Sequence, residues 1–279
     1  MKAPAFMGMF MSTMKIFALV LSTLFLFHTS ASAAVIAQYN FDGNLVDATG
    51  NSSQNGSVLA GSPSFSSNVS PAGGCCSPMS LQLGPSDAVS FNYPFPFNTT
   101  DSLVTSGETL RFWVNPSFVS SEQDIFWTTT SSGDTNRFNI GINSAGRPFI
   151  DWRDPGGTLH LSLGGSIAIA ANTWTELDYV KQKIGPGFEV WLIFVNGVLA
   201  GQSTDESTLP NSTGWTINGR ATEQPNSCCQ FSGLIDNVTF FNEALSPIVP
   251  LPGALPLFAT GLAGLGLLGW RRKGKALSA

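Results

Sequence analysis

Positive charge is scarce in the middle of this chain. Only seven lysine and arginine residues lie between Val35 and Ile248, against all 18 acidic residues of the protein, which gives this segment a net charge of −11. Proteins that bind nucleic acid neutralise phosphates with clustered lysine and arginine, and no such cluster is present. The composition therefore argues against nucleic acid as a partner and suits a protein that stays soluble outside the cell.

Three patterns that indicate particular activities or folds are also missing. The four cysteines lack the C-x-x-C spacing usual at zinc sites. His160 is the one histidine after residue 34, and no serine-elbow motif lies near it, so a hydrolytic triad is not indicated and we expect His160 on a strand surface. No convincing amphipathic helix interrupts the central segment, which argues against alternating strand and helix units.

The N-terminus has the pattern of a secretory signal peptide. Lys15 precedes the apolar run 16–27, and a stretch of small residues ending in Ala31-Ser32-Ala33 follows it. We predict a signal peptide over residues 1–34, cleaved after Ala33 or Ala34, with Met14 as an alternative start. An uncleaved anchor is the other interpretation, although the apolar run is short for a membrane span.

The C-terminus combines a proline motif, an apolar stretch and a basic cluster, in that order. Residues 248–270 carry no charge, and because about 20 apolar residues suffice to cross a membrane, we predict a transmembrane helix over about 253–270. The basic residues that follow would stay on the cytoplasmic side. The motif consists of Val249, Pro250, Leu251 and Pro252, and the basic cluster begins with Arg271, Arg272 and Lys273.

This tail, residues 247–276, resembles the PEP-CTERM sorting signal of Gram-negative bacteria that make extracellular polysaccharide, with Leu251 in place of the usual acidic residue. The resemblance implies processing near the prolines by a membrane exosortase. We therefore expect an exported protein that is transiently anchored in the inner membrane and then released to the cell surface or the extracellular space. A permanent anchor is the alternative.

The four cysteines form two adjacent pairs, Cys75-Cys76 and Cys228-Cys229. An even number of cysteines in an exported protein favours disulfides. Bridges from one pair to the other are favoured, because a bridge between sequence neighbours strains the peptide between them; two such connectivities stay open. Closing a loop of about 150 residues would stabilise the fold by about 5 kcal/mol on the chain-entropy model.

The segment between the two signals has the pattern of short strands separated by turns. Several runs alternate apolar with polar residues, as strands with one buried face do. Asn196-Gly197 lies between two apolar runs and supplies the positive φ angles of a type I′ hairpin turn. We predict an all-β, two-sheet antiparallel jelly-roll sandwich. The expected strands are 35–41, 80–84, 88–92, 109–115, 124–130, 137–143, 148–154, 158–164, 175–182, 188–196 and 234–242.

Six segments, taken in order, resemble a laminin G-like jelly roll of the concanavalin A-like lectin/glucanase superfamily. The resemblance covers residues 35–246 and implies a fold without specifying a ligand, because related domains bind glycans or proteins and others cleave polysaccharides. The segments are 39–58 (YNFDGNLVDATGNSSQNGSV), 80–91, 108–116, 174–182, 190–201 and 231–246.

Paired carboxyl groups for glycoside cleavage are not evident. A retaining glycosidase needs two of them about 5 Å apart, and β-glucanases of this superfamily use a Glu-x-Asp-x-(x)-Glu pattern. Glu122-Gln123-Asp124 and Glu176-Leu177-Asp178 both lack the second glutamate. We expect these acids to face solvent and the protein not to be an enzyme. A divergent polysaccharide hydrolase or lyase is the alternative.

Calcium is a predicted structural cofactor, because the resemblance implies that such an ion is common and because hard cations bind carboxylate and amide oxygens in loops. Asp42, Asn44, Asp47 and Asn51 cluster in one loop, and Asp236 could meet them if the first and last strands pair. The alternative is that these residues form turns, which their composition also favours.

Glycan binding is predicted from the fold, the export route and the aromatic residues that could stack on sugar rings. Trp152, with Asp151 and Arg153 beside it and the turn 155–157 after it, is the candidate for contact with extracellular polysaccharide or a surface protein; ordinary sheet packing is the alternative. Three other tryptophans have apolar strand contexts or stand at strand starts, and we expect them in the core: Trp113, Trp174 and Trp191.

Overall fold

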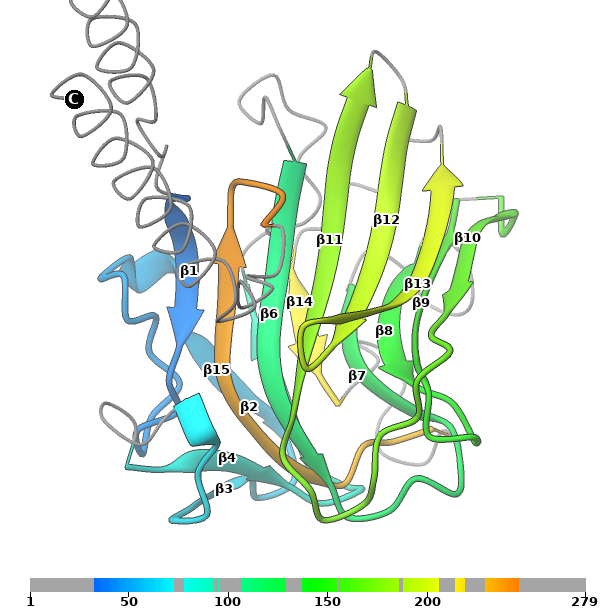
Figure 1. Ribbon diagram of the computed structural model, residues 1–279. Helices are drawn as coiled ribbons and strands as arrows, with labels where there is room; N and C mark the ends of the chain where they lie inside the picture. Colours follow the sequence, from blue (N-terminus) through cyan, green and yellow to red (C-terminus); the bar gives the residue numbers. More distant parts are fainter. Residues whose placement is uncertain are drawn as a thin grey trace, which may run out of the picture. The chain divides into compact units, whose positions relative to one another are not determined.

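The computed structural model describes residues 33–72, 78–92, 95, 107–128, 137–154, 156–185, 188–205, 214–218 and 229–245. These residues form two β-sheets, and the short 3₁₀ helix η1 (Ser52–Gln54) lies between the first two strands (Figure 1). None of the helices in the described part is long and apolar enough to cross a membrane. Nearly all of the predicted signal peptide, and the whole of the predicted transmembrane helix, lie outside the described residues.

The strands are β1 (Val35–Tyr39), β2 (Gly56–Ala60), β3 (Ser64–Ser66), β4 (Ser80–Leu83), β5 (Ala88–Phe91), β6 (Gly107–Pro116), β7 (Gln123–Thr128), β8 (Arg137–Ile142), β9 (Pro148–Arg153), β10 (Leu159–Gly164), β11 (Thr175–Gly185), β12 (Phe188–Val195), β13 (Val198–Asp205), β14 (Trp215–Ile217) and β15 (Gly233–Phe241).

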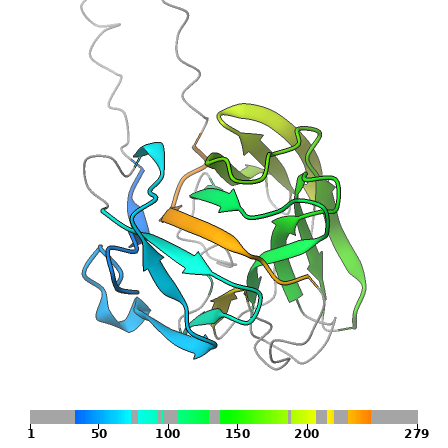
Figure 2. The same ribbon diagram turned by 90° about the horizontal axis from the view of Figure 1, so that it is seen from below.

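Eight strands form one sheet and seven form the other. The eight-stranded sheet has the order β13-β12-β11-β6-β15-β4-β3, with β1 pairing along the same edge of β15 as β4. The seven-stranded sheet has the order β10-β9-β8-β7-β14-β5-β2. Every pairing between these strands is antiparallel. Figure 2 shows β15, in orange, crossing the middle of the domain.

The fold class is therefore confirmed as all-β with two antiparallel sheets, an arrangement consistent with a jelly-roll sandwich. The first and last strands pair as expected, with Tyr39 opposite Val238. Asn196 and Gly197 have φ angles of 49° and 75° and connect β12 to β13, as the predicted hairpin requires. The sequence pattern missed the short strands β2, β3 and β14, which have three to five residues each.

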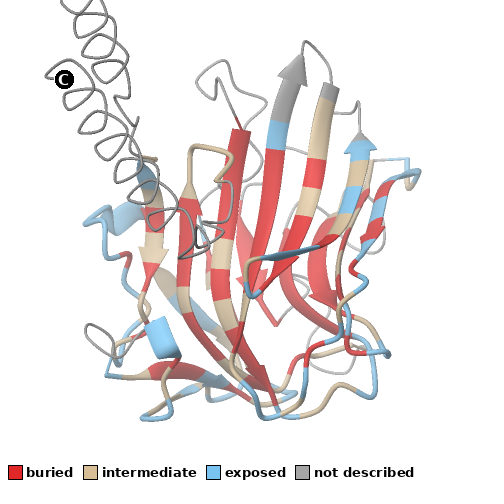
Figure 3. Cartoon of the chain, viewed as in Figure 1, coloured by how far each residue is buried: buried red, intermediate tan, exposed pale blue. Residues whose placement is uncertain are grey.

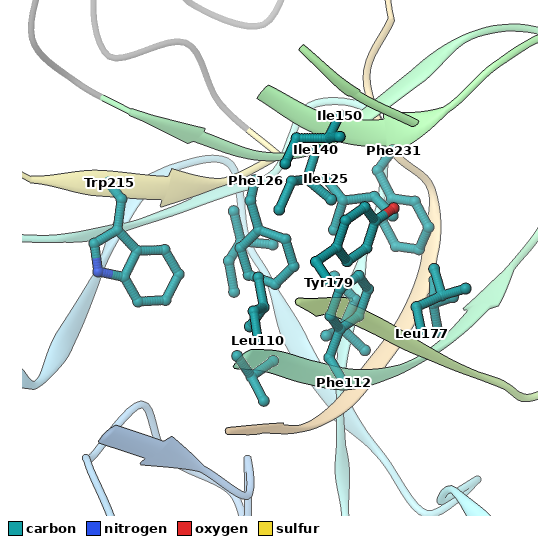
Figure 4. Close-up of a cluster of buried hydrophobic side chains, with 14 of the residues drawn as sticks. Leu110, Phe112, Ile125, Phe126, Ile140, Ile150, Leu177, Tyr179, Trp215 and Phe231 are labelled. Atoms are coloured by element: carbon teal, nitrogen blue, oxygen red, sulfur yellow. The ribbon is translucent and has the colours of Figure 1, made fainter. Parts of the chain in front are cut away.

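The core lies between the two sheets and is rich in aromatic rings (Figure 4). Trp215 of β14 stacks on Phe91 with ring centroids 3.8 Å apart, and its edge contacts include Tyr39 and Phe240 of the opposite sheet. Aromatic pairs of this kind contribute about 0.5–1.5 kcal/mol beyond the burial of their area. Figure 3 shows the buried positions concentrated on the central strands and the exposed ones on the loops.

Strand alternation determines which side chains reach the outer face of the eight-stranded sheet. On β6, Leu110, Phe112 and Val114 are buried in the core, so Arg111 and Trp113 between them point to the other side. The outer face of the sheet therefore carries side chains that are not part of the core.

Tyr179 carries a buried hydroxyl group that has no hydrogen-bond partner among the described residues. Burial raises the pKa of this phenol far above its ordinary value of about 10. The folded chain then keeps a proton that the unfolded chain loses, so the associated stability is present below about pH 10 and is lost as the pH rises.

We predict that Tyr179→Phe raises the free energy of unfolding by about 1 kcal/mol at neutral pH, since it removes a polar group that is buried without a partner. The variant also loses less stability than the wild type above about pH 10. Denaturant titrations across pH measure both effects. Tyr39→Phe is the control: the Tyr39 hydroxyl donates a 2.8 Å hydrogen bond to the Gln54 carbonyl, so its removal destabilises. A destabilised Tyr179→Phe variant contradicts this account.

Candidate functional site

A polar groove of about 460 Å³ lies on the outer face of the eight-stranded sheet. It forms around a row of four residues that lie opposite one another on adjacent strands. In order across the sheet, these are Asn115 of β6, Leu234 of β15, Gln82 of β4 and Ser64 of β3. The neighbours of these residues along each strand, such as Val114 and Ile235, are in the core. Alternation therefore turns the whole row outward.

Hydroxyl and carboxamide groups dominate the lining. Eight of the thirteen described lining residues are serine, asparagine or glutamine, and one, Asp87, is acidic. These uncharged groups both donate and accept hydrogen bonds. Asn115 and Gln82 make no side-chain hydrogen bond in the described part of the chain, so both amides have donors and acceptors left for a ligand; Gln82 is exposed, whereas Asn115 is only 8% exposed.

Both carboxylate oxygens of Asp87 accept hydrogen bonds from nearby backbone amides. Its Oδ1 accepts a hydrogen bond from the Ser62 amide and its Oδ2 accepts one from the Gly84 amide, both at 2.7 Å. Gly61 has φ +69°, and a Cβ atom there would lie 2.2 Å from Asp87 Oδ1, so this turn requires glycine. The carboxylate thus holds the wall of the groove together.

Residues 68–70, here called the strap, lie across the outer face of the sheet beside the groove. Ser80 Oγ donates a 2.8 Å hydrogen bond to the Asn68 carbonyl, and the Ser70 amide donates a 2.9 Å bond to Asp236 Oδ2. Asn68 lines the groove and accepts a 3.0 Å hydrogen bond from Trp174 Nε1. The strap therefore fixes Trp174 at the border of the groove.

Two of the tryptophans that we expected in the core are half-buried. Trp113 lies on the outer face, opposite Asp236 on one side and Glu176 on the other, and Trp174 contacts the strap. The prediction was wrong for both, because an apolar strand context does not show which face a residue takes. It is confirmed for Trp191, which is 1% exposed.

The predicted ligand-binding group is split between the two faces of β9. Trp152 is 3% exposed and packs in the core, in phase with Ile150, so its ring is not on the surface where we expected a platform. Asp151 and Arg153 point outward: Asp151 forms a 2.6 Å ion pair with Arg137, and Arg153 donates a hydrogen bond to the Gly157 carbonyl. The flanking charges suggested exposure, but they belong to the opposite side of the strand.

The acids in the two glucanase-like motifs are more buried than predicted. Asp178 is 2% exposed and accepts bonds from Arg111 Nε (2.6 Å) and Nη2 (3.3 Å). Burial raises the pKa of Asp178, an effect that Arg111 opposes, and burial together with the charge of Asp178 raises the pKa of Glu176. Asp124 is also buried and accepts a 2.7 Å hydrogen bond from Asn139.

The expectation that these acids face solvent is therefore wrong for Asp178 and Asp124. Glu122 is exposed as predicted. Arg111 binds both carboxylate oxygens of Asp178, so this acid is held as half of an ion pair and does not suit the role of a general acid.

His160 is exposed on β10, as expected, and its Nε2 lies 3.0 Å from Asp154 Oδ2. Cys229 is described, whereas Cys75, Cys76 and Cys228 lie outside the described residues, so the disulfides stay a prediction. The sorting motif and the basic cluster also lie outside the described part.

Most of the predicted calcium ligands are engaged in turns. Asp47 Oδ1 accepts hydrogen bonds from the amides of Gln38 and Thr49, and Asn44 Oδ1 accepts one from the Val46 amide. Asn51 caps η1 through the Ser53 amide, and Asp236 binds the strap. The described residues contain no group of three or more histidine, cysteine or acidic side chains placed to hold a metal.

Asp42 is the exception, because its Oδ1 is buried and accepts no hydrogen bond from the part of the chain that the structure describes. An orphaned carboxylate oxygen of this kind fits a cation. Calcium at Asp42 therefore stays a prediction, without the four-residue cluster that the sequence suggested.

We predict that a calcium chelator lowers the midpoint of thermal unfolding, because an ion bound only to the folded state stabilises it, by about 2.7 kcal/mol at a hundredfold excess over the Kd. Asp42→Asn should have a low midpoint that the chelator no longer changes. Scanning calorimetry with and without chelator measures both. An unchanged wild-type midpoint would remove calcium as a structural cofactor.

The profile of the concanavalin A-like lectin/glucanases superfamily matches residues 90–248, more than half of the chain. No curated protein sequence matches at a significant level.

Solved structures share the fold at low identity. Domain 4 of an extracellular GH43 arabinanase from Geobacillus stearothermophilus, solved with arabinotriose, has 18% identity and a TM-score of 0.54, covering 77% of this chain and 95% of that one. The receptor binding domain of botulinum neurotoxin type G has 13% identity and a TM-score of 0.51. The binding domain of botulinum neurotoxin DC, in complex with SialylT, has 17% identity and a TM-score of 0.51. Each neurotoxin match covers 76% of this chain and 48% of the other chain.

Proposed function

Because the chain belongs to the concanavalin A-like lectin/glucanases superfamily, we propose that it is an exported, non-catalytic protein that binds polysaccharide through the groove of its eight-stranded sheet. The observation that carries this proposal is the lining: hydroxyl and amide groups in a concave site of about 460 Å³, with Trp174 at its border. This volume is within the range of about 300–1,000 Å³ typical of small-ligand sites.

The chemistry of the groove suits sugars. A saccharide presents many hydroxyl groups that donate and accept hydrogen bonds, as do the side chains of Asn115 and Gln82. Trp174 can offer an apolar ring surface to the C–H face of a sugar, and its hydrogen bond to Asn68 limits the orientations of the ring. A preorganised site of this kind loses less entropy when the ligand binds.

Two of the compared structures give independent support. The arabinanase domain was solved with arabinotriose, and one neurotoxin binding domain was solved with SialylT. These ligands belong to those proteins, but they make carbohydrate a reasonable first ligand class to test here. A protein partner on the cell surface is the alternative ligand.

A divergent hydrolase or lyase is less well supported. The outer-face acids Glu176 and Asp178 are adjacent on one side of β11, but Arg111 binds Asp178 and lies 4.0 Å from Glu176. Neither acid lines the groove. The described lining of the groove therefore contains no pair of carboxyl groups that could cleave a bound sugar.

The export route remains part of the proposal. A signal peptide over residues 1–34 would deliver the chain across the inner membrane, and the PEP-CTERM-like tail would hold it there until an exosortase releases it. Cell surface or extracellular matrix is then where the groove would meet polysaccharide, in adhesion or matrix organisation.

We predict that Asn115→Ala combined with Gln82→Ala weakens polysaccharide binding by about tenfold or more, because each lost hydrogen bond contributes about 0.5–1.5 kcal/mol. Glycan-array screening followed by calorimetry measures the change. Gln202→Ala is the matched control, since Gln202 is an exposed glutamine of β13 in the same sheet. Binding that persists in the double variant, or no binding to any polysaccharide, would refute the proposed function.

We also predict that Pro250→Ala with Pro252→Ala retains the protein in the inner-membrane fraction, because the processing enzyme would no longer recognise the motif. Fractionation and immunoblotting of the producing cells measure the distribution. Unchanged release would contradict sorting by this tail and would favour a simple membrane anchor.

A further inference from the structure

We infer that the groove selects uncharged sugars and rejects polyuronates and sulfated glycans, an inference that rests on the proposed function. Many extracellular polysaccharides are acidic, so this choice decides which component of a matrix the protein can hold.

No described lining residue carries a positive charge. A carboxylate or sulfate brought into the groove would lose water without gaining an ion pair, which is costly. The acidic group of Asp87 would add repulsion, because both of its oxygens already accept backbone hydrogen bonds and have no donor to offer an anionic ligand. An uncharged sugar hydroxyl has no charge to desolvate and is not repelled by Asp87.

The nearest cation on the same strand face does not change this result. Arg111 lies four residues before Asn115 on β6, about 13 Å along the strand. It is bound to Asp178 at 2.6 Å and has Glu176 at 4.0 Å, so this cluster of one cation and two acids has a negative sum. The segment between Val35 and Ile248 adds a net charge of −11, which repels polyanions at longer range.

Recognition of an uncharged sugar should depend little on salt. Hydrogen bonds between neutral groups are not screened by ions, whereas attraction between exposed charges weakens as the Debye length falls from about 30 Å at 0.01 M to about 3 Å at 1 M. Salt dependence therefore separates the two modes of binding in one titration series.

Position 82 offers a direct test of charge. Gln82 is exposed and lines the groove, so Gln82→Lys adds one cation there without disturbing the core. Gln202→Lys makes the same change of net charge on β13, outside the described lining of the groove. The comparison separates a local effect of the lysine from the overall charge of the protein.

The experiment titrates the full exported protein with neutral oligosaccharides (gluco-, xylo- and arabino-oligosaccharides) and with oligogalacturonate of matched length, at about 0.01 M and about 1 M salt. We expect a neutral oligosaccharide to bind with less than a twofold change between the two salts, and oligogalacturonate not to bind. Gln82→Lys should gain salt-sensitive binding of oligogalacturonate, and Gln202→Lys should not.

The outcomes separate the two proposals. Oligogalacturonate binding to the wild type that is lost in Asn115→Ala would overturn the selectivity while leaving the groove as the polysaccharide site. Oligogalacturonate affinity gained equally in both lysine variants would also overturn it, because the effect would then not be local. Absence of binding to every oligosaccharide, or binding indifferent to Asn115→Ala, would refute the proposed function itself.

Discussion

The packing of aromatic rings around Trp215 is the interaction on which the rest of this structure depends. Trp215 is fully buried in β14, between β7 and β5 of the seven-stranded sheet, and contacts Phe91 and Phe126 of these neighbouring strands. It also contacts Tyr39 of β1 and Phe240 of β15, which belong to the opposite sheet and are the first and last strands along the chain. One side chain thus joins segments from across the chain, and removing a buried aromatic ring of this size typically costs about 3–5 kcal/mol.

The core determines the outer face as well. Once Val114 and Ile235 are buried, Asn115 and Leu234 must point outward, and Gln82 follows because Leu81 and Leu83 on either side are buried. The strap then covers part of this face through the buried carboxylate of Asp236. The groove is the part of this outer face that the strap does not cover. Its polar lining therefore follows from the strand register and from the position of the strap.

The fold could be predicted from the sequence because its signals are local. Alternation located the long strands, and Asn196-Gly197 located a hairpin. The site could not be predicted in the same way. Asn115, Gln82 and Ser64 belong to three different strands. The row also needs β15, the last strand along the chain, to lie between β6 and β4, and local sequence patterns do not show this pairing. Trp152 was misplaced for a related reason: its charged neighbours indicated an exposed segment, but alternation turned the indole inward.

The central claim is that polysaccharide binds on the outer face of the eight-stranded sheet. The most direct test is a crystal structure of the exported protein with a bound neutral oligosaccharide. We expect sugar density within hydrogen-bonding distance of Asn115 and Gln82, with a sugar ring near Trp174. Density on the outer face of the seven-stranded sheet, with the groove filled only by water, would contradict it.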